Sequence, residues 1–219
     1  MGRELGKIEK PAADDYRKGR KLFFVPLIYS SKEAPDGYLE KFDRYWQQAK
    51  ESVNDLELKL GPVDRIYHEF ISAPGEEGLK VLEQLNKKSH QMVLDEIQKG
   101  ARLEAAEDDD LLTEFMDLSR CLGIGLQSQK LQDKLYQYYV EAGKKRSDFI
   151  ANHIDETLRA EEIGILFIKE KNQVQVPSGI EVFYVAPPAL DEINRWLRDS
   201  ETNLPKKRRR KTVKKESDR

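Results

Sequence analysis

The sequence predicts an α/β protein with a mainly parallel sheet flanked by helices, a long helix before the last two strands and a disordered basic C-terminal tail. Short apolar runs typical of buried strands alternate with longer segments whose apolar residues recur every three or four positions. Hydrophobic residues make up 38% and charged residues 36% of the chain, with a mean hydropathy of −0.74. That balance is typical of a folded domain with a strongly charged surface.

These patterns divide the 219 residues into three parts. Residues 1–20 are polar and glycine-containing, and we interpret them as a flexible leader. Residues 21–204 carry all the periodic segments and are predicted to form a single α/β domain, which is a usual size for one core. Residues 205–219 are too charged to bury a core and are predicted to be disordered.

The strand predictions rest on β-branched and aromatic runs bounded by turn residues. We expect strands at 21–29, 63–72, 163–168 and 180–185, with a short strand at 102–105. Pro26 lacks the N–H that a sheet needs, so it should place the first strand at an edge or end it early.

The helix predictions rest on apolar stripes with a period of 3.6 residues. They cover 39–60, 76–98, a stretch that runs toward Cys121, 128–160, and a last helix that Pro187 and Pro188 open. The break between the stretch before Cys121 and the longest helix is expected at Gly123 and Gly125.

Positive charge is concentrated at the C-terminus. Residues 206–219 hold nine Lys or Arg against Glu216 and Asp218, a net charge of +7, which leaves the preceding residues at −9. The eight candidate polyanion-binding residues are Lys206, Lys207, Arg208, Arg209, Arg210, Lys211, Lys214 and Lys215. Such a run attracts nucleic acid, a ribosome or an anionic membrane surface by charge alone, and it also fits a nuclear-import signal or a solubilising tail.

Cys121 is the only cysteine, so the chain cannot form an internal disulfide. The first residues contain no apolar stretch typical of a signal peptide, and no run of about 18 apolar residues occurs. We therefore predict a cytoplasmic protein without a membrane span.

Candidate catalytic groups are expected just beyond the carboxyl ends of the strands, where sites in open parallel sheets gather. The polar residues at these positions are Ser30, Ser31, His68, Glu69, Ser72, Lys169, Glu170 and Asn172. Glu69 is the most unusual, because a carboxylate in a strand-like run is costly to bury without a partner. It is either a functional carboxylate or one half of an ion pair or an exposed edge residue. His68, its neighbour, should face the opposite side of the strand.

The familiar signatures of phosphate loops, dinucleotide sites, zinc ligands and nucleophile elbows are missing. Asp108, Asp109 and Asp110 could hold Mg²⁺ through carboxylate oxygens or could simply begin a helix, where negative charge is favoured. No metal site is predicted from the remaining residues, and no cofactor is indicated.

The segment VDRIYHE at 63–69, together with RSDFIANHI at 146–154 leading into GILFI at 164–168, resembles the TraB/ChaN and erythromycin-esterase-like group of α/β proteins. The resemblance implies a hydrolase-like scaffold in which Glu69 and Arg146 line a cleft. That group usually has a histidine after the later strand, where this sequence has Lys169, Glu170, Lys171 and Asn172. The later segment also resembles bacterial domains related to peptide release factors.

Three functional hypotheses follow. The first is a non-catalytic or regulatory binding protein that contacts nucleic acid or another polyanion through its tail. The second is a hydrolase-like or metal-assisted enzyme with Glu69, Arg146 and Glu170 at its site. The third is a structural protein that forms homo-oligomers, suggested by Trp46, Trp196 and the cluster Tyr136, Tyr138 and Tyr139.

Overall fold

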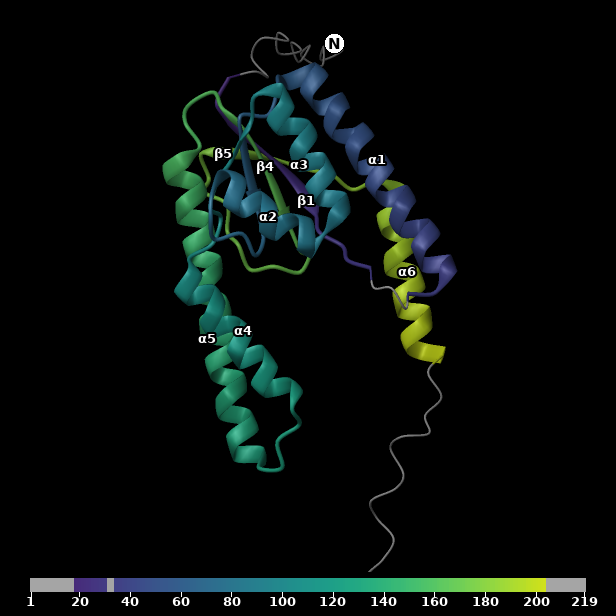
Figure 1. The fold of residues 1–219 in the computed structure, drawn as a ribbon, viewed down its shortest axis with the longest axis vertical. Coiled ribbons are helices and arrows are strands. Elements are labelled where there is room, and N and C mark those ends of the chain that lie inside the picture. The colour runs from purple at the N-terminus through teal and green to yellow at the C-terminus, as the bar shows by residue number, and fades with distance from the viewer. Residues whose placement is uncertain (1–17, 31–33, 204–219) are drawn as a thin grey trace, which may run out of the picture.

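The computed structural model describes residues 18–30 and 34–203, and the predicted leader and tail lie almost wholly outside those ranges. The elements, in chain order, are β1 (Arg20–Pro26), α1 (Asp36–Leu60), β2 (Arg65–His68), α2 (Gly75–Leu85), α3 (Lys87–Lys99), β3 (Arg102–Leu103), α4 (Asp109–Gly123), α5 (Gln129–Thr157), β4 (Ile163–Ile168), β5 (Ile180–Tyr184) and α6 (Pro188–Asn203) (Figure 1).

The five strands found in the described residues are all parallel and lie in the order β3-β2-β4-β1-β5, so the predicted fold class is confirmed. The central strand β4 is buried along its whole length, which explains its continuous apolar sequence. Within the described ranges, no helix combines the length and the apolar character that a membrane crossing requires.

Of the two alternatives predicted for Pro26, the edge position is excluded, because β1 pairs with β4 on one side and β5 on the other. The strand does end early, at Pro26. Leu27 donates its N–H to the carbonyl of Ile168 in β4. Because successive backbone N–H groups of a strand point to opposite neighbours, the ring nitrogen of Pro26 faces β5, and that strand already ends at Tyr184. No ladder bond is lost there, which explains why the proline is tolerated.

Helices cover both faces of the sheet. Apolar residues of α1, α2, α3 and α6 pack against one face, around Phe23, Ile66 and Phe167. The second half of α5 covers the other face, where Ile150, Ile154 and Leu158 meet Tyr67 and Leu166. The segment that follows β4 adds Val174 and Val176 to this second core.

Two sequence predictions in the middle of the chain need correction. The single helix expected at 76–98 is two helices, because Asn86 adopts an extended backbone and its side chain caps α3 by accepting the N–H groups of Lys88 and Ser89. The strand expected at 63–72 is shorter and ends at His68, because the chain turns at Glu69 and Phe70.

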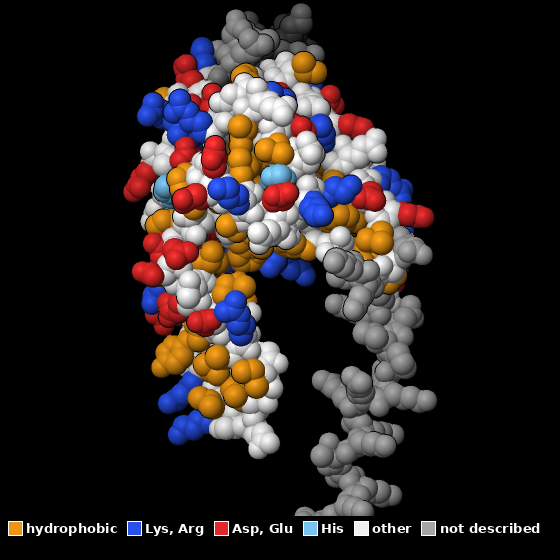
Figure 2. Space-filling model, viewed as in Figure 1, with side chains coloured by type: hydrophobic (Ala, Val, Ile, Leu, Met, Phe, Trp, Pro, Cys, Tyr) orange, Lys and Arg blue, Asp and Glu red, His pale blue; other side chains and the backbone are white. Residues whose placement is uncertain are grey.

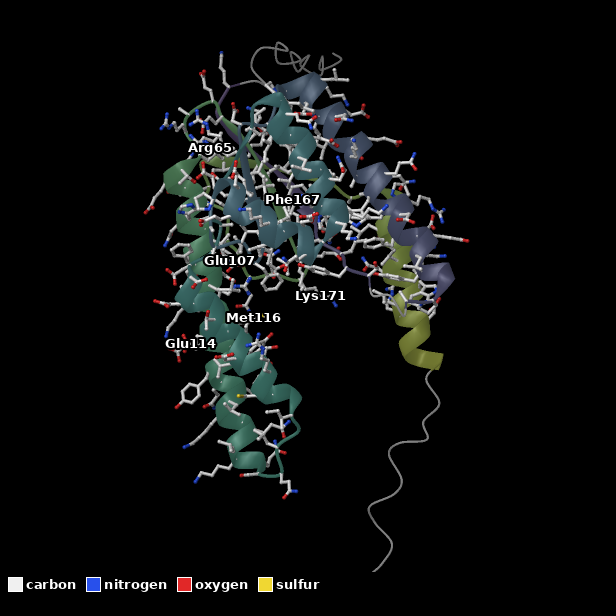
Figure 3. All side chains as sticks on the ribbon, in the orientation of Figure 1. Arg65, Glu107, Glu114, Met116, Phe167 and Lys171 are labelled. Atoms are coloured by element: carbon white, nitrogen blue, oxygen red, sulfur yellow. The ribbon has the colours of Figure 1, made fainter. Side chains whose placement is uncertain are left out.

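Two pairs of helices project beyond the carboxyl edge of the sheet. One consists of α4 with the first half of α5, and the other consists of α6 with the start of α1, where Tyr38 packs on Trp196. The space-filling view shows a wide hollow between them, with basic side chains at its roof (Figure 2). Lys171 lies at this roof and points toward the hollow (Figure 3).

A buried carboxylate lies between α1 and α3. Glu96 is only 3% exposed, and its Oε1 accepts a hydrogen bond of 2.9 Å from Lys99, which also pairs with Glu57. Its Oε2 has no hydrogen-bond partner within the described part of the chain. Burial, opposed by the Lys99 hydrogen bond and reinforced by the charge of Glu57, raises the pKa of Glu96 to about 7.

Replacing Glu96 by Gln should therefore change how stability depends on pH. The folded protein holds this proton more tightly than the unfolded chain, so the contribution of Glu96 is full below about pH 4.5 and is lost as pH rises toward 7. We expect Glu96→Gln to match the wild type at about pH 4 and to be more stable by about 1–3 kcal/mol at about pH 8. Urea unfolding at both pH values measures this, with the exposed Glu83→Gln as the control; equal stabilities at the higher pH would contradict it.

Candidate functional site

The candidate site lies at the carboxyl edge of the sheet, around the end of β4. The connection that follows β2 leads to α2 on one face, whereas the segment after β4 crosses the opposite face through Val174 and Val176. Neighbouring strands whose connections leave to opposite faces open a crevice between them, and ligands of open α/β sheets bind in such crevices. Glu69 follows β2 and Lys169 follows β4, so both flank this crevice.

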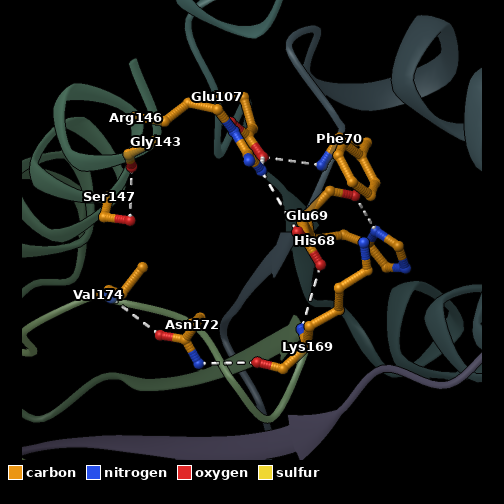
Figure 4. Close-up of polar contacts among 10 residues, drawn as sticks. All are labelled: His68, Glu69, Phe70, Glu107, Gly143, Arg146, Ser147, Lys169, Asn172 and Val174. Carbon is orange, nitrogen blue, oxygen red and sulfur yellow. Dashed lines mark hydrogen bonds and ion pairs between the residues drawn. The ribbon is translucent and has the colours of Figure 1, made fainter. Parts of the chain in front are cut away.

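A buried ion cluster joins three elements at this point. Arg146 of α5 donates from Nε to Glu107 Oε2 at 2.5 Å and from Nη2 to Glu107 Oε1, so the pair is bidentate (Figure 4). Nη2 also donates to Glu69 Oε1 at 3.4 Å. All three side chains are buried, at 6% exposure for Arg146 and Glu69 and 2% for Glu107. Two carboxylates thus converge on one guanidinium.

The surroundings keep this guanidinium charged. Burial by itself lowers the pKa of Arg146, but the hydrogen bonds and charges of Glu107 and Glu69 outweigh it, and the pKa is raised. The rings of Phe70 and Phe115 lie 5.1 Å and 4.6 Å from the guanidinium carbon, and their faces also favour a cation.

Backbone N–H groups also donate to the two carboxylates. Phe70 donates its N–H to Glu107 Oε1 at 2.9 Å, and Lys169 donates its N–H to Glu69 Oε2 at 3.1 Å. Phe70 has a φ of +70°, a conformation that costs a bulky residue free energy. The hydrogen bond to Glu107 holds this strained turn, which brings both Glu69 and the Phe70 ring next to Arg146.

Beside the cluster lies a cleft of about 260 Å³. Its walls are α5, the end of β4 and the segment that follows it, with one residue from α4 and one, Glu69, from the turn after β2. The lining residues are Glu69, Phe115, Tyr136, Tyr139, Val140, Gly143, Arg146, Ser147, Ile150, Ile168, Lys169, Lys171, Asn172 and Gln173. Part of the lining is therefore aromatic and apolar, and another part consists of two lysines and two amides.

Lys169 and Tyr29 provide polar groups next to the ion cluster. The Lys169 ammonium lies 5.0 Å from the ring centre of Phe70 and 5.8 Å from that of Tyr29. The Tyr29 hydroxyl is buried and has no hydrogen-bond partner among residues 18–30 and 34–203. Burial, with the charge of Glu69, raises the pKa of Tyr29, so its hydroxyl keeps the proton and can donate it.

The structure brings together some of the residues singled out from the sequence and separates others. Glu69 and Arg146 meet and both line the cleft, in the ion-pair arrangement that was one of the alternatives for Glu69. Glu170 does not join them, because it accepts a hydrogen bond of 3.1 Å from Asn194 of α6 on the other side of the sheet. Asn172 lines the cleft, whereas Ser31 lies outside the described residues.

His68 faces away from the cleft, as the alternation of strand side chains predicts. It is fully buried, with its ring nitrogens bonded to the Glu69 carbonyl at 2.6 Å and the Ser89 hydroxyl at 3.0 Å. Burial lowers the pKa of His68 to about 4, so the ring is neutral near pH 7.

The aspartates before α4 act at the helix start. Asp108 accepts the N–H of Leu111 and caps the helix, and Asp109 accepts the hydroxyl of Ser72. In the part of the chain that the structure describes, no three His, Cys, Asp or Glu side chains gather as metal ligands.

Glu107 is the site residue that the sequence reasoning missed. It follows the short strand β3, so the rule that polar residues beyond a strand end gather at one edge also applies to it. Its sequence signal is weak because three aspartates follow it directly, and a run of acidic residues there is also typical of a helix start.

No family model, curated protein or solved structure matches the chain. The resemblance to the TraB/ChaN and erythromycin-esterase-like group, and the likeness to release-factor-related domains, therefore stay predictions.

The ion cluster makes a specific prediction about stability. Replacing Arg146 by Met leaves two buried carboxylates facing each other, which should cost about 3–5 kcal/mol. Replacing Glu69, Arg146 and Glu107 together by Gln, Met and Gln removes all the charges but keeps the acceptors for the two backbone N–H groups, so the loss should be smaller. Denaturant unfolding compares the variants, and a triple variant as unstable as Arg146→Met would contradict the account.

Proposed function

We propose that this chain is a non-catalytic, cytoplasmic α/β protein that binds an anionic group of its ligand in the carboxyl-edge cleft. Its basic tail draws polyanions such as nucleic acid toward the molecule. The cytoplasmic location rests on cysteine usage, because a single Cys121 cannot form the internal disulfide that would suggest an oxidising compartment.

One observation carries the proposal: the carboxylates in and beside the cleft are already paired, whereas its lysines have no acidic partner among the described residues. The carboxylate oxygens of Glu69 and Glu107 accept hydrogen bonds from Arg146 and from backbone N–H groups. Lys169 and Lys171 have no acidic partner among the described residues, and Lys169 touches only the faces of aromatic rings. A ligand that supplies negative charge here gains attraction without breaking an existing ion pair.

The local charge agrees with this assignment. Arg146, Lys169 and Lys171 against Glu69 and Glu107 give this corner a net charge of +1, although the chain before residue 206 is strongly acidic. The amide of Gln173 adds a donor to the same lining, whereas Asn172 already donates from Nδ2 to the Lys169 carbonyl at 2.8 Å. A locally positive cleft in an acidic body discriminates in favour of an anion that fits it.

The tail would attract the ligand before the cleft binds it. Eight basic residues between 206 and 215 attract any polyanion from a distance, and this attraction weakens as salt increases. The cleft would then hold one phosphate or carboxylate of the captured molecule, so the two elements make separable contributions to affinity.

We expect fluorescein-labelled single-stranded RNA to bind the full chain, as measured by fluorescence anisotropy at two salt concentrations. Lys169→Gln with Lys171→Gln should weaken binding about tenfold or more, and should reduce the salt slope by about 1.4 if each lysine meets one phosphate. Deleting residues 206–219 should reduce the slope further, because more contacts are lost.

Lys59→Gln with Lys80→Gln is the matched control, since it removes the same charge from exposed positions far from the cleft. The cleft assignment fails if this control weakens binding as much as the cleft variant does. Inorganic phosphate as a competitor separates the two elements, because it should displace ligand from the cleft more readily than from the tail.

A hydrolase-like enzyme is a second candidate, favoured by the convergence of Glu69 and Glu107 beside the cleft and by the strained backbone of Phe70. Strained residues of this kind gather at active sites. Arg146 would then stabilise an anionic group, and a carboxylate released from the cluster would act on water.

This candidate predicts turnover of p-nitrophenyl acetate or p-nitrophenyl phosphate that depends on Glu69. Glu69→Gln should lower the rate at least about a hundredfold, as expected on loss of a general base. Glu170→Gln, outside the cleft, should leave it unchanged and serves as the control. A wild-type rate equal to the buffer blank, or equal losses in both variants, would dismiss the enzyme.

A further inference from the structure

The α4–α5 hairpin, defined here as residues 109–141, extends beyond the body of the protein and leaves much of its apolar surface uncovered. α4 has no fully buried residue, although it carries Leu111, Leu112, Phe115, Leu118 and Leu122 at helical spacing. The buried residues of α5 begin only at Ala142. Figure 2 shows hydrophobic side chains gathered on the visible face of this hairpin.

One stripe of α5 runs from the core into solvent. Ala142 is buried, Leu135 is half-buried, and Tyr138 and Leu131 are 57% and 48% exposed. These four positions are spaced by three or four residues and so share one face of the helix. Ile124, in the turn between the helices, is 75% exposed. A stripe that continues past the body in this way normally meets another helix.

We propose that this stripe packs against the same hairpin of a second copy of the chain, forming an antiparallel four-helix bundle between two protomers. Two helices cannot enclose an apolar core, whereas four can. A two-fold axis across the hairpin would place the two bodies at opposite ends and match each stripe with itself.

The charges along the hairpin favour this partner and this direction. The tip, residues 117–134, has Arg120, Lys130 and Lys134 against Asp117 and Asp133, a net of +1. The base, residues 109–116 and 135–141, has four acidic residues, Asp109, Asp110, Glu114 and Glu141, and no Lys or Arg. An antiparallel pair sets the basic tip of one hairpin against the acidic base of the other.

The same charges disfavour the other occupants. The hairpin as a whole has a net charge of −3, which repels nucleic acid and anionic lipid surfaces. The proposed dimer is thus independent of the anion-binding cleft, whose tyrosine wall, Tyr136 and Tyr139, lies on a different face of α5 from Leu131 and Tyr138.

Sedimentation velocity of the full chain over a range of concentrations tests the proposal. The wild type should form a dimer, and Leu131→Glu with Tyr138→Glu should raise its dissociation constant at least about a hundredfold, because two charges enter an apolar seam. Leu58→Glu, at a position of α1 that is 80% exposed, is the matched control and should have no effect. Circular dichroism shows that each variant is folded.

Charge reversal distinguishes this bundle from any other contact. Lys130→Glu with Lys134→Glu should weaken the dimer about tenfold, and adding Asp110→Lys with Glu114→Lys to the same chain should restore it. Failure of the second pair to rescue the first would overturn the antiparallel arrangement.

Cys121, the only cysteine, is exposed on α4 and gives an independent readout. It lies about five residues from the middle of α4, so the two copies would be separated by about 15 Å along the bundle before the labels are added. A spin label there should give an intermolecular dipolar distance that disappears in Leu131→Glu with Tyr138→Glu. A wild type that stays monomeric, a dimer insensitive to that variant, or labels without an intermolecular distance would each refute the proposal.

Discussion

The guanidinium of Arg146 joins three parts of the chain that would otherwise meet only through loops. It binds Glu107, between β3 and α4, and Glu69, at the end of β2. Arg146 itself belongs to α5, which covers the face of the sheet opposite to α1, α2, α3 and α6. Burying these charges costs free energy that the pairing must offset, and breaking the set leaves an uncompensated charge. The cluster therefore fixes where α5 lies relative to the carboxyl edge.

This constraint also explains the strained turn after β2. Phe70 reaches its left-handed conformation because its N–H donates to Glu107, and Glu107 is held in turn by Arg146 and by the carbonyl of Ile71, which accepts its backbone N–H at 3.0 Å. The turn carries the Phe70 ring over Arg146 on one side and near the Lys169 ammonium on the other. Two cations thus share one aromatic ring, and within residues 18–30 and 34–203 only Arg146 has carboxylate partners.

Much of the fold could be predicted because strong patterns decide it. The continuous apolar runs at β1 and β4 identify buried parallel strands, and the stripe of α1 identifies a helix against them. The break at Asn86 could not be predicted in this way, because the apolar period continues across it and only the capping hydrogen bonds reveal two helices. The interior position of β1 could not be predicted from Pro26. Whether this proline removes a hydrogen bond of the sheet depends on which neighbouring strand its nitrogen faces and on whether that strand extends so far.

The site was predictable only in part for a related reason. Glu69 stands out as a charge in an apolar run, whereas Glu107 lies among acidic residues and looks like one more helix-start carboxylate. Glu170 follows the right strand but turns to α6, since consecutive residues beyond a strand end point to opposite sides. Position along the chain brings residues to the edge of the sheet, and tertiary packing decides which of them face one another.

The ion cluster lies where the two proposed binding surfaces separate. Phe115 of α4 packs on Arg146 and stacks on Tyr139 of α5 at 4.8 Å, so the base of the hairpin and the wall of the cleft share this aromatic contact. Beyond it, the hairpin extends past the body, and its uncovered stripe lies on a different face of α5 from the tyrosine wall of the cleft. The ion cluster and Phe115 thus hold the base of the hairpin against the sheet. With the base fixed, the cleft faces a ligand at the roof of the hollow, and the uncovered stripe of α5 remains open to a second protomer.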